Sequence, residues 1–322
     1  MDDLVQDFLT QLKHHCPHMK SLTLYFDRVS PNIQQSAFLL SGFSKLEVFG
    51  LHTRNGRQGV KEEAALVAVL SRLPALKKLT LSSLYLDNLG EDVLEVGGFC
   101  ALQYLAVGRL QINADKPTPI CKINTPAQLR ELIGCTYNSR IFKLLLEAMI
   151  ARNVDIHCLR FDIMDKLTVE DTQLFTSFRH LRRLRLDGMS DFQLMDDDIK
   201  YLAQNLPSLQ QLAFEPIEWP SHTNITLLSI QHIVMYCLEI EEILFTLDAT
   251  IVPALIYSWD QKPAPRCCAL SINVRCSRIN DARAVASWLK NCCRGFDDVT
   301  IHWNRLSSGR DEWAKVEQLL LL

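Results

Sequence analysis

Apolar residues recur along the chain in a fixed skeleton, at successive spacings of three, three and two residues. The clearest copy is LPSLQQLAF at 206–214, and others are CPHMKSLTL at 16–24 and FRHLRRLRL at 178–186. Neighbouring copies begin 25 to 31 residues apart, and such a narrow period over a whole chain indicates a repeat array. The residues equivalent to Leu212, here called markers, are Leu22, Phe49, Leu79, Leu105, Leu132, Leu159, Leu184, Leu212, Ile243, Leu270 and Val299.

Each copy predicts a short strand, because apolar residues two apart, such as Leu184 and Leu186, point to one face of an extended chain. The segments between copies change to helical spacing, as at 62–73, 139–153 and 196–206, with helix start signals at 196–198 and Asp281. This alternation predicts an α/β fold, a leucine-rich repeat solenoid of about eleven strand-helix repeats. We expect a horseshoe with a parallel sheet on its concave face and helices outside.

A repeat array grows by adding units, so the length of 322 residues does not require two domains. We expect a single leucine-rich repeat domain over residues 1–322. Its predicted parts are an N-terminal capping helix at 1–15, repeats at 16–303 and a C-terminal capping helix at 304–322. The longest loops are expected at 116–126 and 215–224, which are rich in proline and polar residues.

Charge and hydropathy exclude several classes of partner. Lys and Arg number 34 against 37 Asp and Glu, so no global basic field favours nucleic acid or an anionic membrane. The N-terminus lacks the basic and apolar regions of a secretory signal. Residues 224–238 are apolar but shorter than the roughly 18 residues of a membrane span, and predict a buried helix. We therefore expect a monomeric cytoplasmic or nuclear protein that binds no nucleic acid and no membrane.

The eleven cysteines favour core packing over chemistry. Cys16, Cys237 and Cys293 stand six residues before markers, a position that elsewhere holds Leu or Phe, so we interpret them as small hydrophobic residues. His14, Cys16 and His18 offer two nitrogens and a sulfur, but their spacing fits no standard zinc pattern, and a metal site is kept only as a minor alternative. Because no catalytic motif is present, we predict no enzyme, cofactor or metal.

In such arrays the residues that flank each marker point to the concave face, where a protein partner is expected to bind. Charge is densest on the strands around Leu159 and Leu184, and Tyr104 and Ile133 form a weaker, apolar patch. The arginines there fit carboxylates or phosphate on a partner, or they pair with neighbouring aspartates on a solvated sheet. The predicted partner-binding residues are Tyr104, Ile133, Arg160, Asp162, Arg183, Arg185 and Asp187.

The last repeats carry a further likeness. The segments SIQHIVMYCLEIEEILFTLDAT (229–250), VASWLKNCCRGFDDVTIHW (285–303) and EWAKVEQLL (312–320) resemble the closing repeats of fungal F-box proteins of the basidiomycete, mushroom-forming lineage. The resemblance implies a substrate receptor of a cullin-type ubiquitin ligase, in which an F-box holds the adaptor and the repeats hold the target. No F-box is evident before the first repeat at Cys16, so the ligase adaptor is an expected partner only if an F-box exists outside this chain. The alternative is a stand-alone scaffold or inhibitor.

Overall fold

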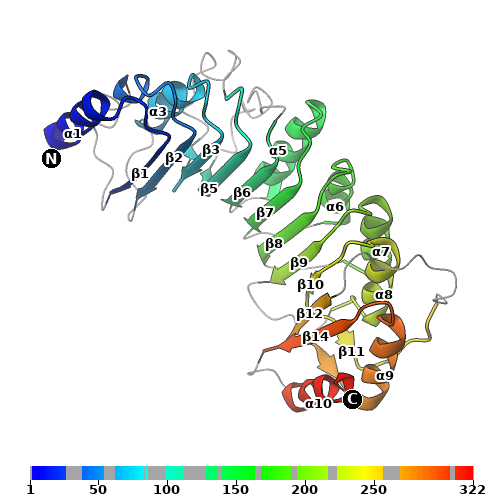
Figure 1. Ribbon diagram of the computed structural model, residues 1–322. Coiled ribbons are helices and arrows are strands. Elements are labelled where there is room, and N and C mark those ends of the chain that lie inside the picture. The colour runs from blue at the N-terminus through cyan, green and yellow to red at the C-terminus, as the bar shows by residue number, and fades with distance from the viewer. Residues whose placement is uncertain are drawn as a thin grey trace. The chain divides into compact units, whose positions relative to one another are not determined.

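The computed structural model forms two compact units, residues 1–156 and 157–322, each built from parallel strands and helices (Figure 1). The prediction of one uninterrupted domain stays a prediction. The structure describes residues 2–26, 38–53, 62–82, 84–85, 99–111, 128–136, 139–163, 168–189, 194–216, 223–256, 269–304 and 309–321.

The first unit contains a parallel sheet in the order β1-β2-β3-β5-β6, with the short β4 beside β5. Its helix α3 falls where helical spacing is predicted at 62–73, and α5 falls in the predicted segment 139–153. The helices are α1 (Asp2–His15), α3 (Glu62–Ser71) and α5 (Ser139–Ala151). The strands are β1 (Ser21–Phe26), β2 (Val48–Thr53), β3 (Lys78–Leu81), β4 (Leu84–Tyr85), β5 (Tyr104–Gln111) and β6 (Glu131–Thr136).

The second unit contains a parallel sheet in the order β7-β8-β9-β10-β12-β14, and β11 pairs separately with β13. Helices α6 to α9 lie along one side of these strands (Figure 1). The strands are β7 (Cys158–Ile163), β8 (Arg183–Met189), β9 (Gln211–Pro216), β10 (Glu242–Leu244), β11 (Asp248–Ala249), β12 (Ala269–Arg275), β13 (Arg278–Ile279) and β14 (Asp298–Trp303). The helices are α6 (Val169–Phe175), α7 (Asp196–Asn205), α8 (Leu227–Tyr236), α9 (Ala282–Cys292) and α10 (Arg310–Leu320).

The predicted repeat register is confirmed in both units. Leu22 lies opposite Phe49, Phe49 opposite Leu79, and Leu184 lies between Leu159 and Leu212. Most marker side chains are buried. Along β8, the buried Leu184 and Leu186 alternate with the more accessible Arg183 and Arg185. The fold is therefore the predicted α/β leucine-rich repeat solenoid, and the described residues supply five main strands in the first unit and six in the second.

One pairing departs from the predicted register. Ile243 of β10 lies opposite Ile272 of β12, two residues beyond the predicted marker Leu270. Leu270 itself still pairs with the next marker, Val299. A shift of two residues keeps the same side chains on the buried face, because strand side chains alternate with period two. The apolar pattern alone therefore cannot distinguish these two registers.

Polar side chains fix the helix starts that the sequence predicts. Asp281 accepts hydrogen bonds from the backbone N–H groups of Arg283 and Ala284 and so caps α9. Asp196, in the first turn of α7, accepts from the N–H and the hydroxyl of Thr226, at 2.8 and 2.6 Å. Because Thr226 is the N-cap of α8, this aspartate ties one repeat to the next. Helix α8 is largely buried, as predicted for 224–238.

The interpretation of the three repeat cysteines is correct for two of them. Cys237 and Cys293 are buried, and the Cys237 thiol donates to the carbonyl oxygens of Ala203 and Leu206. Cys16 is exposed, so its interpretation as a core residue is wrong. It follows directly after α1, in a turn that the first repeat does not cover.

Two predicted loops fall wholly or mostly outside the residues that the structure describes. The loop at 116–126 lies outside the described residues, as does most of the loop at 215–224. Within the described part of the chain, no helix combines the length and the apolar character that crossing a membrane requires.

Candidate partner-binding face

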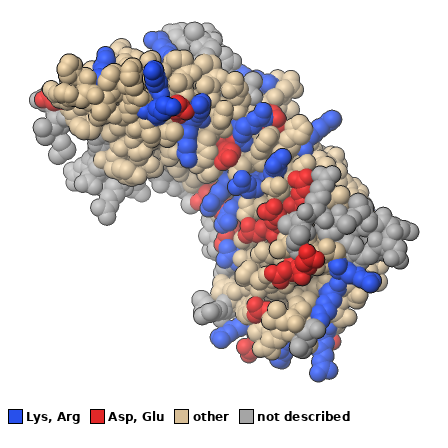
Figure 2. Space-filling model, in the orientation of Figure 1, with Lys and Arg blue, Asp and Glu red and all other residues tan. Residues whose placement is uncertain are grey.

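The sheet face that carries the residues directly before and after each marker is called here the open face. On β7 and β8 it carries five of the predicted site residues: Arg160, Asp162, Arg183, Arg185 and Asp187. Arg160 lies directly opposite Arg185, and Asp162 lies opposite Asp187. The alternation of the strands thus brings these five side chains together, because every second residue points to the same face. Lys and Arg side chains lie next to Asp and Glu side chains over this part of the second unit (Figure 2).

The two remaining predicted residues, Tyr104 and Ile133, lie in the first unit on β5 and β6. Both are partly exposed, and Ile133 is opposite Ala106. The ammonium group of Lys78 lies 4.2 Å from the centre of the Tyr104 ring, within range of a cation–π contact. This patch is therefore less apolar than the sequence suggests, because a charged side chain covers one side of the tyrosine.

A chain of ion pairs crosses β8, β9 and β12. Arg185 Nε donates to Asp187 at 2.8 Å, Arg185 Nη2 donates to Glu215 at 3.0 Å, and Arg275 Nη2 donates to the other oxygen of Glu215 at 2.7 Å. These side chains are only 19 to 27% exposed. For Arg185 and Asp187 the pairing interpretation from the sequence is therefore correct, and these two residues contribute mainly to the structure of the face.

Arg160 and Arg183 are more accessible. The Arg160 side chain is 51% exposed and reaches Asp187 only at 3.4 Å, although Asp187 already accepts from Arg185. Arg183 is exposed and forms no ion pair among the residues that the structure describes. Since surface arginines with weak or absent partners retain their hydrogen-bonding capacity, these two side chains are the ones best placed to contact another molecule.

Asp162 and Gly188 lie close together on this face. Burial, with a smaller effect from the neighbouring Asp187 charge, raises the pKa of the Asp162 carboxyl above its ordinary value, while the Arg160 charge opposes the shift. Gly188 has a backbone φ of +77°, and a β-carbon there would overlap Asp162 Oδ1. Gly188 is also the extra residue of an irregularity between Asp187 and Met189, which returns the buried Met189 to the core side.

The sequence analysis did not include Arg275 in the site. It overlooked this residue because it counted from Leu270, whereas Ile272 is the residue opposite the marker Ile243. Arg275 stands three residues after Ile272, as Glu215 stands three after Leu212. The backbone of Arg275 has a φ of +50°, an unfavourable conformation for a side chain other than glycine, and its guanidinium is held by Glu215.

Polar residues at the strand starts form a separate row. In the first unit Glu47 lies between Lys20 and Lys77, with ion pairs of 3.3 and 2.8 Å. Hydrogen bonds from Lys77 and Lys20 lower the pKa of the Glu47 carboxyl. One carboxylate therefore serves two lysines on this row of the first unit.

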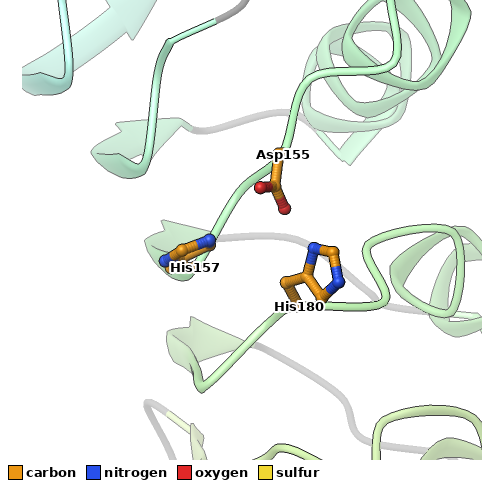
Figure 3. Close-up of side chains that lie close together, drawn as sticks. All are labelled: Asp155, His157 and His180. Carbon is orange, nitrogen blue, oxygen red and sulfur yellow. The ribbon is translucent and has the colours of Figure 1, made fainter.

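His14, Cys16 and His18 do not support the minor metal alternative from the sequence. Among the described residues, the ligand atoms of His14, Cys16 and His18 do not converge on one point. Figure 3 shows three other side chains, those of Asp155, His157 and His180. Asp155 is paired with Arg130 within the first unit, and in the second unit the rings of His157 and His180 meet edge to face with centroids 6.3 Å apart.

A scan against models of protein families finds no match, and a search of curated proteins finds none either. Among solved structures, the chain is similar to one from the Rad7 and Elc1 complex in yeast, at 12% identity and a TM-score of 0.48, over 96% of this chain and 86% of that one. It is also similar to the leucine-rich repeat-containing protein LegL7 from Legionella pneumophila, at 13% identity and a TM-score of 0.47, over 97% and 93%. The fold assignment rests on the repeat register and strand order described above.

Proposed function

We propose that this chain is a protein-recognition module that binds a protein partner through the open face of β7 and β8. The observation that carries the proposal is the exposed Arg183, which has no ion pair among the described residues and lies beside the weakly paired Arg160. Arginine is enriched at the energetic centres of protein interfaces, since its planar fork forms two directed hydrogen bonds at once.

The structured part of the face supports binding as well. The ion pairs from Arg185 through Glu215 to Arg275 hold the neighbouring side chains in place. A preorganised surface loses less side-chain entropy when a partner binds, so more of the contact energy remains as affinity. The proposal involves no catalysis, cofactor or metal.

Within this role, we propose a substrate receptor of the type found in F-box ubiquitin ligases. The support is the resemblance of 229–250, 285–303 and 312–320 to the closing repeats of basidiomycete F-box proteins. Such a receptor works in the cytoplasm or nucleus, and the ligase adaptor binds only through an F-box outside this chain. The second candidate is a stand-alone scaffold or inhibitor that binds the same partner without a ligase.

Affinity capture from extracts of the source cells, followed by mass spectrometry, separates these candidates. Recovery of the adaptor and a cullin together with another protein supports the receptor role. Reproducible enrichment of another protein without adaptor or cullin supports the stand-alone role and removes the ligase connection.

Charge reversal tests the face itself. The double variant Arg160→Glu/Arg183→Glu is expected to lose the captured partner, because two exposed cations become anions at the proposed contact. The matched control, Arg283→Glu/Lys290→Glu, makes the same change in net charge at exposed positions of α9 in the same unit. Full capture by the first variant would remove this face from the proposal.

A further inference from the structure

The cross-strand neighbours of Arg183 carry no compensating charge. Arg183 lies between Cys158 and Gln211 in the register of β7, β8 and β9. Arg182, one residue earlier, is bonded through its backbone to His157 and Gln210, and its side chain is also exposed. Arg182 and Arg183 form no ion pair among the described residues. Arg160 and Arg183, which share the open face, are called here the basic cluster.

The nearest acids neutralise this cluster only in part. Asp187 is 3.4 Å from Arg160 but divides its carboxylate between Arg160 and Arg185. The other acidic neighbour, Asp162, is only partly exposed, and its buried Oδ1 accepts no hydrogen bond from Arg160. The basic cluster therefore keeps an excess of positive charge on an accessible surface.

In the strand-start row of the first unit, positively charged side chains are paired with a carboxylate. There Glu47 is placed between Lys20 and Lys77, and both lysines pair with it. The corresponding neighbours of Arg182 are His157 and Gln210, which supply no carboxylate. Arg182 therefore adds a further exposed positive charge at the start of β8, next in sequence to the basic cluster.

We infer that the basic cluster binds an acidic segment of the partner protein, so that carboxylates of the partner supply the counter-charge. This inference rests on the proposed function, since it concerns the same face, and it adds the chemistry of the bound segment. Arginine guanidinium groups bind carboxylates through paired, charge-assisted hydrogen bonds.

The spacing of the cluster fits an extended peptide. Arg160 and Arg183 are diagonal neighbours on adjacent parallel strands, because Arg160 lies opposite Arg185. Such neighbours are roughly 7–8 Å apart. In an extended chain, residues i and i+2 point to the same side and are about 6.6 Å apart. Two acidic residues separated by one other residue can therefore reach both arginines.

The surrounding charges favour a short acidic segment over nucleic acid. Asp162, Asp187 and Glu215 are aligned across the ends of β7, β8 and β9, and Glu242 lies opposite Gln211 on β10. These carboxylates border the basic cluster on two sides and repel a continuous polyanion. The whole chain, with a formal charge of −3, adds no attraction for a phosphate backbone.

Fluorescence anisotropy tests this inference with the full chain and a labelled peptide of alternating Glu and Ser. We expect the peptide to bind, with affinity that falls as salt is raised, and Arg160→Glu/Arg183→Glu to weaken binding by about tenfold or more. The control Arg283→Glu/Lys290→Glu is expected to bind within about twofold of the unchanged chain. Single-stranded DNA of equal charge is expected to bind about tenfold more weakly than the peptide.

The possible results distinguish a failure of the acidic-segment inference from a failure of the proposed function. Equal or tighter binding of the DNA would overturn the acidic-segment inference in favour of nucleic acid, and so would equal peptide binding by the reversal variant. If the reversal variant loses the captured cellular partner but the unchanged chain does not bind the peptide, the proposed function stands and the inference is overturned. If the peptide competes with the captured partner on the unchanged chain, both are supported.

Discussion

Replacing Gly188 with alanine tests the geometry beneath the open face. Two costs add at this position. The first is the φ of +77°, which costs a residue with a β-carbon about 1–2 kcal/mol. The second is the overlap of that carbon with Asp162 Oδ1, which forces the carboxylate to move; overpacking of this kind costs about 1–3 kcal/mol. We therefore expect Gly188→Ala to lower the free energy of unfolding by about 2–5 kcal/mol.

The two costs separate in a double-mutant cycle with Asp162→Ala. Removing the carboxylate eliminates the overlap, so that Gly188→Ala in this background is expected to cost only the backbone strain of about 1–2 kcal/mol. Urea denaturation at pH 7, followed by circular dichroism, measures the free energy of unfolding for all four chains, with an unchanged slope against urea.

Gly50→Ala serves as the control. Gly50 also lies on a strand, but its φ is not positive, and the nearest atom to an added β-carbon is the Thr23 methyl at 3.0 Å. We expect a change within about 1 kcal/mol in either direction. A loss below about 0.5 kcal/mol for Gly188→Ala would refute the strained geometry, and an equal loss with and without the Asp162 carboxylate would refute the contact.

The remaining predictions concern core packing and charge. Leu184→Ala should lower the free energy of unfolding by about 2–5 kcal/mol in urea, since the side chain is fully buried; a loss below about 0.5 kcal/mol would contradict the repeat register. Arg185→Glu should lower the free energy of unfolding by about 1–3 kcal/mol, because it breaks two partly buried ion pairs. Arg183→Glu should change the free energy of unfolding by less than about 0.5 kcal/mol, and equal losses for the two variants would contradict their assigned roles. The raised pKa of Asp162 stabilises the fold below its unfolded pKa, and this contribution is lost as pH rises through the folded pKa. Asp162→Asn should therefore gain stability relative to the unchanged chain as pH rises through the folded pKa, as thermal melts over a pH series can measure. The pKa of Glu47 is shifted in the opposite direction, so the stability that Glu47 contributes above its unfolded pKa should be lost as pH falls through its folded pKa. Thermal melts of Glu47→Gln should lack this pH-dependent loss of stability.

The sequence predicted the repeat fold well, because the apolar pattern states directly which residues are buried. Leu159, Leu184 and Leu212 fall opposite one another as expected. The pattern failed where two registers bury the same face, as at Leu270 and Ile272 of β12. It also failed at Cys16, since a position in a repeat is buried only if other residues cover it.

The sequence predicted that the candidate residues share one face, but not which of the arginines are paired. The spacing placed Arg160, Arg183 and Arg185 on one face, and the structure confirms that placement. Which arginine is paired depends on side-chain conformations and on residues such as Arg275, more than eighty positions away in the sequence. The strain at Gly188 likewise follows from an irregularity between strands that no local pattern announces.

The alternation along β8 places core packing and the proposed partner contact on neighbouring residues. Leu184 and Leu186 are buried in the core, while Arg183 and Arg185, their neighbours in sequence, lie on the open face. Mutation can therefore change Arg183 without weakening the core, whereas Arg185 is constrained by its ion pairs. Under the proposed function, the exposed arginines can change with the partner while the scaffold is kept, and an engineered library can begin at the same positions.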